Sequence, residues 1–297
     1  MSEFTSVEFT GGTALPGTIA YQGEPGSNSQ LACEQAWPEH ATAPYPTFED
    51  VFAAVVDGEV DRALIPIENS LAGRVADIHH LLPTSGLFVV GEHFLPITFH
   101  LMALPGVQVA ELKTVHSHIH ALGQCRKVIR RLGLRPIVAG DTAGAAREIA
   151  ELGDRTAASL SPLPAAALYD LDVLEHNVED EAHNTTRFVM LARRPAEVSP
   201  GVVEVVTCFV FRVRNIPAAL YKALGGFATN GVNMTKLESY MVDGQFSATQ
   251  FYAEVDGHPE QPPLRRALEE LSFFAAQMRM LGTFPASPLR RDLVQSG

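Results

Sequence analysis

The chain has 297 residues, of which 46% are hydrophobic and 19% charged, a balance typical of folded globular proteins rather than disordered or fibrous ones. Lys and Arg total 22 against 34 Asp and Glu, giving a formal net charge of −12, which opposes binding to nucleic acid or to anionic membranes. With no apolar run of the ~20 residues that a membrane helix needs and no signal-peptide pattern, we expect a cytoplasmic protein of two or three compact units.

Short apolar strands alternate with amphipathic helices through the first two thirds of the chain. After a leader over residues 1–16 that lacks a regular period, we expect strands at 18–21, 62–67, 87–91, 114–116, 136–139 and 156–159. Helices are expected between them, at 27–37, 47–58, 117–132 and 142–152. This alternation with short turns is typical of parallel α/β sheets.

The composition changes between Ala192 and Gly201, where Arg, Pro, Ser and Gly indicate a linker. Beyond it, the pattern predicts strand, helix, strand, strand, helix and strand over residues 203–213, 217–229, 233–242, 246–255, 263–273 and 278–284. Asp243-Gly244 predicts a hairpin turn between the two central strands. The βαββαβ order is that of the ferredoxin-like motif, so we expect a domain boundary near residue 200.

Four strand-to-helix turns of the first domain are rich in small, hydroxyl or amide side chains, and they lie at residues 24–29, 69–70, 116–118 and 141–144. Helix N-termini and such side chains can donate hydrogen bonds to a carboxylate or phosphate. Each turn alone is also explained by helix capping. Because doubly wound sheets gather such turns at one edge, the set predicts a site for a small anion.

The histidines and cysteines do not predict a metal centre. His116, His118 and His120 alternate, but the strand is expected to end at Ser117, so the rings should diverge as the helix begins. Cys33, Cys125 and Cys208 are too far apart for a thiolate site or a disulfide framework, and we expect buried thiols.

Several segments together resemble the prephenate dehydratase family with a C-terminal ACT regulatory domain. The matching stretches in chain order are Ile19–Ser27, Pro66–Ser70, Val115–His118 with Gln124 and Cys125, Asp141–Ala146, Asn184–Phe188, Pro217–Leu224 and Asn233–Ser239. The resemblance implies an α/β fold, with a two-lobed catalytic domain like periplasmic binding proteins over 17–195 and a ferredoxin-like ACT domain over 203–285. Lobe one would comprise about 17–94 and 180–195, and lobe two about 95–179.

The same resemblance implies a reaction and its residues. Prephenate would lose water and carbon dioxide to give phenylpyruvate, on the route to phenylalanine, without a metal or organic cofactor. Thr186 would supply the hydroxyl needed for turnover and Arg187 would hold a substrate carboxylate. The remaining cleft residues would be Asn69, Ser117 and Gln124, with substrate contacts from Ser27, Ser70, Thr142 and Ala143.

Phenylalanine is the expected effector, bound between the ACT domains of a homodimer or homotetramer. Free helix N–H groups at Ala218, Ala219 and Leu220 suit its carboxylate, and Glu238 or a backbone carbonyl suits its ammonium group. The other effector contacts would come from Asn233, Leu237 and Ser239. We expect one face of strand 203–213 to support the two helices, and the opposite face and the edge strand to be left to pair with a second chain.

Two departures from the family pattern and two other functions remain open. The central turn reads Ser117-His-Ile-His-Ala121 where the family has Ser-His-Pro-Gln-Ala, so the effect of Ile119 and His120 is undetermined. In the ACT domain, Glu238-Ser-Tyr-Met241 replaces Glu-Ser-Arg-Pro, which bears on the strength of regulation. The alternatives are an arogenate dehydratase and a two-lobed anion-binding sensor without catalysis.

Overall fold

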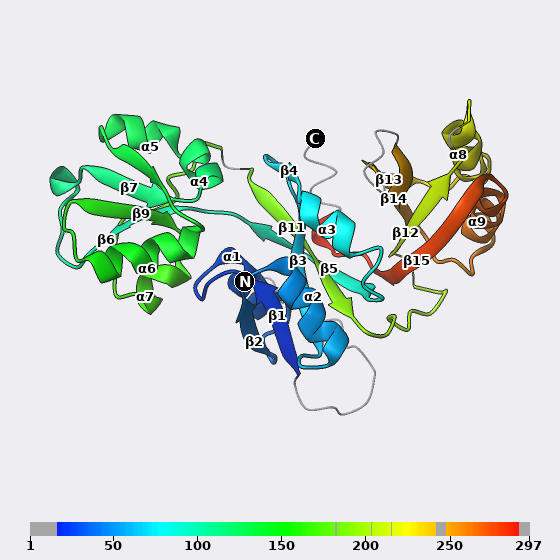
Figure 1. Ribbon diagram of the computed structural model, residues 1–297, viewed down its shortest axis with the longest axis horizontal. Coiled ribbons are helices and arrows are strands. Elements are labelled where there is room, and N and C mark those ends of the chain that lie inside the picture. Colours follow the sequence, from blue (N-terminus) through cyan, green and yellow to red (C-terminus); the bar gives the residue numbers. More distant parts are fainter. Residues whose placement is uncertain (1–16, 182, 203, 215, 242–247, 291–297) are drawn as a thin grey trace.

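The computed structural model describes residues 17–181, 183–202, 204–214, 216–241 and 248–290, which form three sheets arranged in a row (Figure 1). The central sheet belongs to lobe one, and it lies between lobe two and the C-terminal domain. The leader over residues 1–16 and the turn at Asp243-Gly244 lie outside the described residues.

Lobe one is built on a mixed sheet with the strand order β2-β1-β3-β11-β5. Its strands are β1 (Thr18–Gln22), β2 (Ala41–Tyr45), β3 (Arg62–Asn69), β5 (Phe88–Pro96) and β11 (Thr185–Ala192), with the short β4 (Gly73–Arg74) paired to β3. Its helices are α1 (Asn28–Ala36), α2 (Phe48–Asp57) and α3 (Ala76–Leu81). β1 is parallel to β2 and β3, whereas β11 returns from lobe two and runs antiparallel to β3 and β5.

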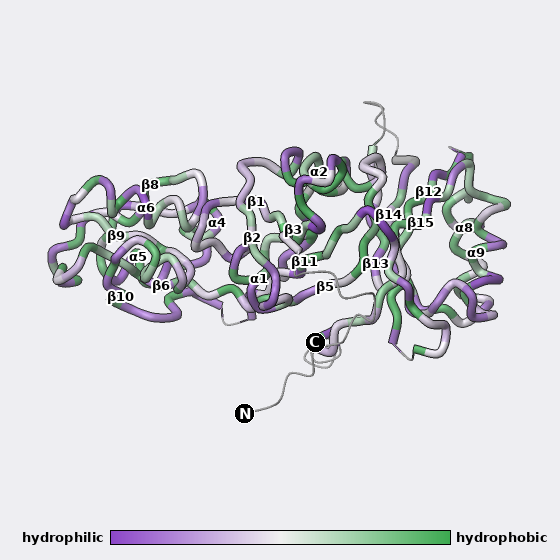
Figure 2. Tube along the Cα trace, turned by 90° about the horizontal axis from the view of Figure 1, so that it is seen from below, coloured by the Kyte–Doolittle hydropathy of each residue, from purple (hydrophilic) through white to green (hydrophobic). Residues whose placement is uncertain are grey.

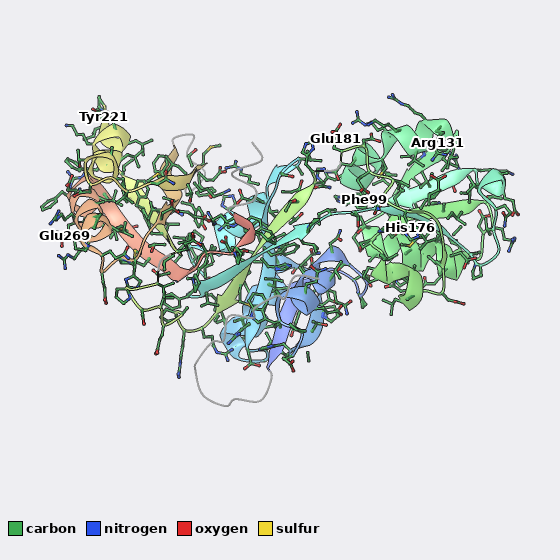
Figure 3. All side chains as sticks on the ribbon, turned by 180° about the vertical axis from the view of Figure 1, so that it is seen from behind. Phe99, Arg131, His176, Glu181, Tyr221 and Glu269 are labelled. Carbon is green, nitrogen blue, oxygen red and sulfur yellow. The ribbon has the colours of Figure 1, made fainter. Side chains whose placement is uncertain are left out.

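Lobe two has the strand order β10-β6-β9-β7-β8. Its strands are β6 (His100–Ala103), β7 (Thr114–Ser117), β8 (Arg135–Val138), β9 (Ala157–Ser161) and β10 (Asp172–Glu175). Its helices are the 3-10 turn η1 (Val109–Glu111), α4 (Ile119–Gln124), α5 (Arg126–Arg131), α6 (Thr142–Leu152) and α7 (Pro164–Leu168). The two chain crossings between the lobes are tied together near Phe99 and His176, because Phe99 N donates to the Glu179 carboxylate at 2.9 Å (Figure 3).

The helix expected over residues 117–132 is two helices, α4 and α5, which meet at Cys125. Cys125 leaves the helical conformation at φ −122° and ψ 31°. The reason lies in the second crossing between the lobes, where the Asp180 carboxylate accepts hydrogen bonds from Arg126 N (3.0 Å) and Lys127 N (2.9 Å). Asp180 thus satisfies the first N–H groups of a new helix.

The C-terminal domain consists of β12 (Val205–Val213), α8 (Ala219–Thr229), β13 (Met234–Met241), β14 (Ala248–Asp256), α9 (Pro262–Phe274) and β15 (Ala275–Pro285). Its sheet is antiparallel, in the order β13-β14-β12-β15. The predicted ferredoxin-like order is confirmed, and so is the α/β fold of the first domain. Its two sheets are mixed rather than parallel, because β11 in lobe one and β6 in lobe two run antiparallel to their neighbours. Helix α8 begins after Pro217 rather than at it, because Ala218 has a left-handed φ of 60°.

The two faces of the C-terminal sheet have different neighbours. Phe209 and Phe211 pack with residues of α8 and α9, as expected. On the opposite face, Val206, Cys208 and Val210 share one buried cluster with lobe-one residues of β3 and β5. The expectation that a second chain covers this face is therefore wrong, since lobe one covers it. Figure 2 shows α8 and α9 on the outer side of the sheet and lobe one on its inner side.

Candidate active site

A chain of hydrogen-bonded polar side chains starts where β3 ends and β11 begins. Asn69 and Thr186 are register partners, and Asn69 Nδ2 donates to Thr186 Oγ1 at 2.9 Å. The same nitrogen donates to Asn184 Oδ1 at 2.7 Å, and Asn184 Nδ2 donates to Gln124 Oε1 at 2.8 Å. Gln124 ends α4, so the chain of side chains runs from lobe one into lobe two.

The direction of these hydrogen bonds follows from the backbone around Asn69. Asn69 Oδ1 accepts from Leu71 N (3.0 Å) and Ala72 N (2.8 Å), so the amino group of this amide must face Thr186. Thr186 Oγ1 is then an acceptor from Asn69, and its own hydrogen remains available for another acceptor. By the same logic, the Gln124 oxygen is occupied by Asn184 and its amino group is left to donate.

Asn184 is a site residue that the sequence analysis assigned no role. Its side chain joins Asn69 to Gln124, and only 2% of the residue is exposed, so both ends of the amide need partners inside the protein. Its site role could have been predicted from its position, because Asn184 begins the Asn-Thr-Thr-Arg stretch that carries the family resemblance.

A cavity of about 630 Å³ adjoins Gln124. Leu71 and Ala72 of lobe one and residues of α4, α5 and β8 line it. Its lining is apolar apart from a few groups, among which Arg126 and Arg130 carry positive charge. His120, which stands where the family pattern has Gln, also lies on this wall.

Arg187 does not join the polar side chains around Thr186, contrary to expectation. Neighbouring residues of a strand point to opposite faces of the sheet, so Arg187 points away from Thr186. Its guanidinium pairs with Glu92 (2.8 Å), Glu68 (2.9 Å) and Glu254 (2.8 Å), toward the C-terminal domain. The side chain is 5% exposed. This placement does not support contact between Arg187 and a substrate carboxylate.

The hydroxyls of the predicted serines bond to the backbone. Ser117 is fully buried and donates to the Leu160 carbonyl at 2.6 Å. Ser70 donates to the His183 carbonyl at 2.9 Å and accepts from Thr185 N at 3.0 Å, which fastens the end of β3 to the start of β11. Ser27 is the N-cap of α1, where its hydroxyl accepts from Gln30 N.

Thr142 and Ala143 form the first turn of α6. Asp141 caps this helix, and its carboxylate accepts from Gly144 N at 2.7 Å. The N–H groups of Thr142 and Ala143 lie in the first turn of the helix, where no helical carbonyl lies four residues before them. They therefore remain available as donors. The N-terminus of α6 therefore offers partial positive charge, as the sequence predicted for this turn.

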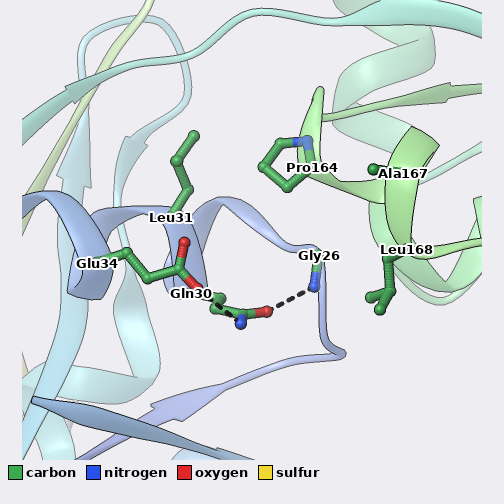
Figure 4. Close-up of a pocket in the computed structure, with 7 residues that line it drawn as sticks. All are labelled: Gly26, Gln30, Leu31, Glu34, Pro164, Ala167 and Leu168. Carbon is green, nitrogen blue, oxygen red and sulfur yellow. Dashed lines mark hydrogen bonds between the residues drawn. The ribbon is translucent and has the colours of Figure 1, made fainter. Parts of the chain in front are cut away.

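The lobes meet along the turn that follows β1. Tyr169 donates to the Pro25 carbonyl at 2.8 Å, and Arg147 of α6 lies 3.6 Å from Glu24. Figure 4 shows α1 facing α7 across a second cavity of about 330 Å³, with Gly26 at its edge. The strand-end turns of the two lobes thus approach one another.

The rings of His118 and His120 stay close, with centroids 5.1 Å apart, so the expectation that all three histidine rings diverge is wrong for this pair. His116 lies 3.3 Å from the Thr114 hydroxyl, and His118 Nδ1 accepts from His120 N. Burial lowers the pKa of both His116 and His118. In the part of the chain that the structure describes, no group of three or more His, Cys, Asp or Glu is arranged to hold a metal ion. Among the same residues, no helix is long and apolar enough to cross a membrane.

The predicted effector residues fall into two groups. Ala218, Ala219 and Leu220 lie at the start of α8. On β13, Glu238 faces lobe one and pairs with Arg74 at 3.5 Å, whereas Leu237 and Ser239 alternate to the other face. Asn233 donates to the Asp256 carboxylate at 2.7 Å, next to the end of β14.

The fold and the site define a two-lobed α/β enzyme with a polar site at the junction of its lobes and a ferredoxin-like C-terminal domain. A family model described as prephenate dehydratase matches residues 19–196. The chain belongs to the prephenate dehydratase family. The family recognised in the sequence is thereby confirmed, as is the enzyme class, a lyase acting on prephenate.

Individual relatives cover nearly the whole chain. A bifunctional N-acyl-homoserine lactone acylase/prephenate dehydratase of Komagataeibacter europaeus is 54% identical over 92% of this chain and 97% of its own length. Arogenate dehydratase 2 of Petunia hybrida is 37% identical over 90% of this chain and 71% of its own. The prephenate dehydratase of Arthrobacter aurescens, solved in complex with L-Phe, superposes with a TM-score of 0.83 at 26% identity, covering 94% of this chain and all of that one.

Proposed function

We propose that the protein converts prephenate to phenylpyruvate at the junction of its lobes, with Thr186 as the group that assists departure of the ring hydroxyl. The hydrogen bond from Asn69 to Thr186 carries this proposal, because it leaves the threonine hydrogen free for the leaving oxygen. Asn184 and Gln124 extend the same network toward lobe two.

The chemistry needs little acid strength from the protein. The bond from the ring to its carboxylate breaks as carbon dioxide leaves, and that electron pair completes the aromatic ring. The bond to the ring hydroxyl breaks, and the departing oxygen takes up one proton from the solvent pool, so that water leaves and one proton is consumed overall. A threonine hydroxyl is a weak acid, so Thr186 stabilises the departing oxygen by a hydrogen bond rather than by full proton transfer.

The substrate carries two carboxylates, and the protein carries a net charge of −12, so local positive groups must offset this repulsion. The free amides of α6 supply one such group, and Arg126 and Arg130 beside Gln124 supply the other.

We expect Arg130→Gln to raise KM for prephenate by roughly 10-fold while kcat changes little, since a contact kept throughout the reaction affects binding alone. Steady-state kinetics measures this, and an unchanged KM contradicts the role.

The test of the activity is direct. Purified protein mixed with prephenate should produce the ultraviolet absorbance of phenylpyruvate, and mixing with arogenate should produce phenylalanine more slowly or not at all. Absence of turnover with both substrates contradicts the proposal and favours an anion-binding sensor. Faster turnover of arogenate makes the protein an arogenate dehydratase.

We further propose that phenylalanine binds the C-terminal domain and regulates the enzyme. The complex of the Arthrobacter protein with L-Phe supports this, as do the first-turn amides of Leu220 and Tyr221 in α8, whereas Ala219 N donates to the Ile216 carbonyl. Large apolar side chains stand exposed on this domain, including Tyr221 at 81% and Phe273 at 82%, which suits a homodimer or homotetramer. Calorimetry with phenylalanine and sedimentation with and without it test both parts, and no heat of binding contradicts the regulation.

Two further points belong to the proposal. The described cysteines are free and buried, which suits the reducing cytoplasm.

The apolar cavity beside Gln124 also suits an acyl chain, and the Komagataeibacter relative carries an acylase activity in its name. Release of homoserine lactone from an N-acyl derivative is therefore a second candidate activity. Chromatography of the products tests it, and an intact substrate after long incubation excludes it.

A further inference from the structure

Six charged side chains gather between lobe one and the C-terminal part of the chain, on the face of β11 opposite Thr186. We call them the interdomain charge cluster: Arg187, Glu68 and Glu92 from lobe one, and Lys236, Glu254 and Arg290 from the C-terminal part. The three cations balance the three carboxylates. Arg187 lies at its centre, because it pairs with all three carboxylates, and Glu254 joins Arg187 of lobe one to Arg290 of the C-terminal part.

The centre of the cluster is shielded from water, whereas Glu68 at its edge is 33% exposed. The side chains of Glu92 and Glu254 are fully buried, and that of Arg187 is 5% exposed. Glu254 also accepts from the Tyr252 hydroxyl at 2.6 Å and from Arg290 at 3.2 Å. A buried charge that loses its partner destabilises the protein strongly. Movement of Glu254 removes one of the three carboxylate partners of the buried Arg187, and the pair thereby links β11 to β14.

The link reaches β11 directly beside Thr186. Arg187 is the next residue, and its backbone is paired to Glu68 of β3 and Phe94 of β5. The pairing of β11 with β3 shifts between Arg187 and Phe188, so the ladder is interrupted there. The ion pairs of Arg187 thus supply part of the restraint on the strand at the point where Thr186 meets Asn69.

We propose that Glu254, acting through Arg187, is a positioning residue for Thr186 and couples the C-terminal domain to the catalytic strand. This inference rests on the function proposed above. Neither Glu254 nor Arg187 contacts substrate in it. A change in the C-terminal sheet, such as binding of an amino acid there, alters the orientation of the Thr186 hydroxyl and hence the rate of the chemical step.

The first experiment separates positioning from substrate binding. We expect Glu254→Gln to lower kcat by roughly 10- to 100-fold with KM within about twofold, since displacement by about 1 Å at a reacting group has effects of this size. Arg187→Lys should show the same division between kcat and KM. A raised KM in Arg187→Lys together with normal kinetics in Glu254→Gln overturns the inference, because Arg187 would then bind substrate itself.

Arg279→Gln is the matched control. Arg279 also crosses the domain interface, where it donates to the carbonyls of Pro83 and Leu87, neither of which belongs to β11. Its kcat should stay near that of the parent. A loss of kcat equal to that of Glu254→Gln means that any weakening of the interface has this effect, and it overturns a specific role for the cluster.

The double variant Arg187→Gln/Glu254→Gln separates positioning from stability. It removes one charge of each sign and restores the balance of the cluster, so its Tm should lie above those of the corresponding single variants while its kcat stays low. Recovery of kcat together with Tm overturns the inference. A parent protein that does not turn over prephenate contradicts the proposed function instead, whereas an active parent with unchanged kcat in Glu254→Gln contradicts this inference alone.

Discussion

At the scale of single residues, the site depends on one amide whose orientation the backbone determines. Asn69 has its oxygen held by Leu71 N and Ala72 N, and its nitrogen therefore meets Thr186 and Asn184. Such preorganised polar groups are effective because they need not reorient during the reaction. The catalytic contribution of Thr186 can then be measured by removing its hydroxyl alone.

We expect Thr186→Ala to lower kcat by roughly 100-fold or more with little change in KM, because the hydrogen bond to the leaving oxygen strengthens in the transition state. Thr186→Ser, which keeps the hydroxyl, should retain more activity. Thr185→Ala is the matched control. The backbone N–H and carbonyl of Thr185 bond to Ser70, and alanine keeps both of these groups. Steady-state assays compare the three, and an alanine variant within a few-fold of the parent rules out the role of Thr186.

At the scale of elements, the junction of α4 and α5 shows how a distant residue ends one helix and starts another. Asp180, in the second crossing between the lobes, binds Arg126 N and Lys127 N, and its carbonyl accepts from Lys127 Nζ at 2.8 Å. Gln124, the last residue of α4, lies next to this break, and its carbonyl accepts from Asp180 N. The crossing segment thus holds both helices beside the site.

Asp180→Ala should lower the free energy of unfolding by about 1 kcal/mol, the usual loss for an N-cap. It should also reduce activity modestly, because Gln124 loses part of its support. Glu181→Ala is the control, since Glu181 is an exposed neighbouring carboxylate (Figure 3). Urea unfolding measures the difference, and equal stabilities of the two variants would show that Asp180 does not cap α5.

At the scale of the whole molecule, the C-terminal domain and lobe one share a buried core. Val206, Cys208 and Val210 pack with residues of β3 and β5 in one cluster. A chain cut near residue 200 would expose this apolar face and leave Arg187 and Glu92 without Glu254 and Arg290. The domains therefore depend on each other for stability, and point variants test regulation better than truncation.

Gly282 lies where the backbones of the two domains approach closely. A Cβ at this position of β15 would lie 1.9 Å from the Val89 carbonyl oxygen of β5, so the backbones must separate to admit it. We expect Gly282→Ala to reduce the free energy of unfolding by roughly 1–3 kcal/mol or more, as overpacking does. Gly225→Ala in α8, with open space around it, should be neutral or stabilising. Thermal unfolding of both variants measures the difference. If Gly282→Ala lowers Tm no more than Gly225→Ala does, the close packing of β15 on β5 is contradicted.

The interdomain charge cluster should make stability depend on acidic pH. Burial opposes ionisation of Glu254, but Arg187 and Arg290 outweigh it and lower the pKa of Glu254 from 4.5 to about 2. Burial likewise opposes ionisation of Glu68, yet Lys236 and Arg187 bring its pKa below the usual value. Both carboxylates bind protons more readily in the unfolded chain, so their stabilising contribution is complete above about pH 4.5 and declines as the pH falls toward about 2.

Urea unfolding between about pH 6 and about pH 3 measures this decline. Glu254→Gln should be less stable at neutral pH and lose less stability on acidification than the parent, because it lacks one of the two groups. Parallel pH profiles for parent and variant would show that Glu254 does not contribute.

Local sequence pattern was sufficient to predict much of the strand–helix alternation, though not β2, β6 or β10, and the ferredoxin-like order, because periodicity and turn residues depend on near neighbours. The family resemblance, rather than local pattern, pointed to Asn69, Gln124 and Thr186 as site residues. The alternation of a strand also implies that Thr186 and Arg187 face opposite ways, although the family resemblance had placed both at the substrate. Only the tertiary structure decided what Arg187 meets on its face, namely Glu254 of a strand 67 residues away. Likewise, Asp180 ends the predicted long helix from 54 residues away, and lobe one covers the sheet face that was expected to pair with a second chain. These outcomes depend on which distant segments pack together, and a local pattern carries no information about that choice.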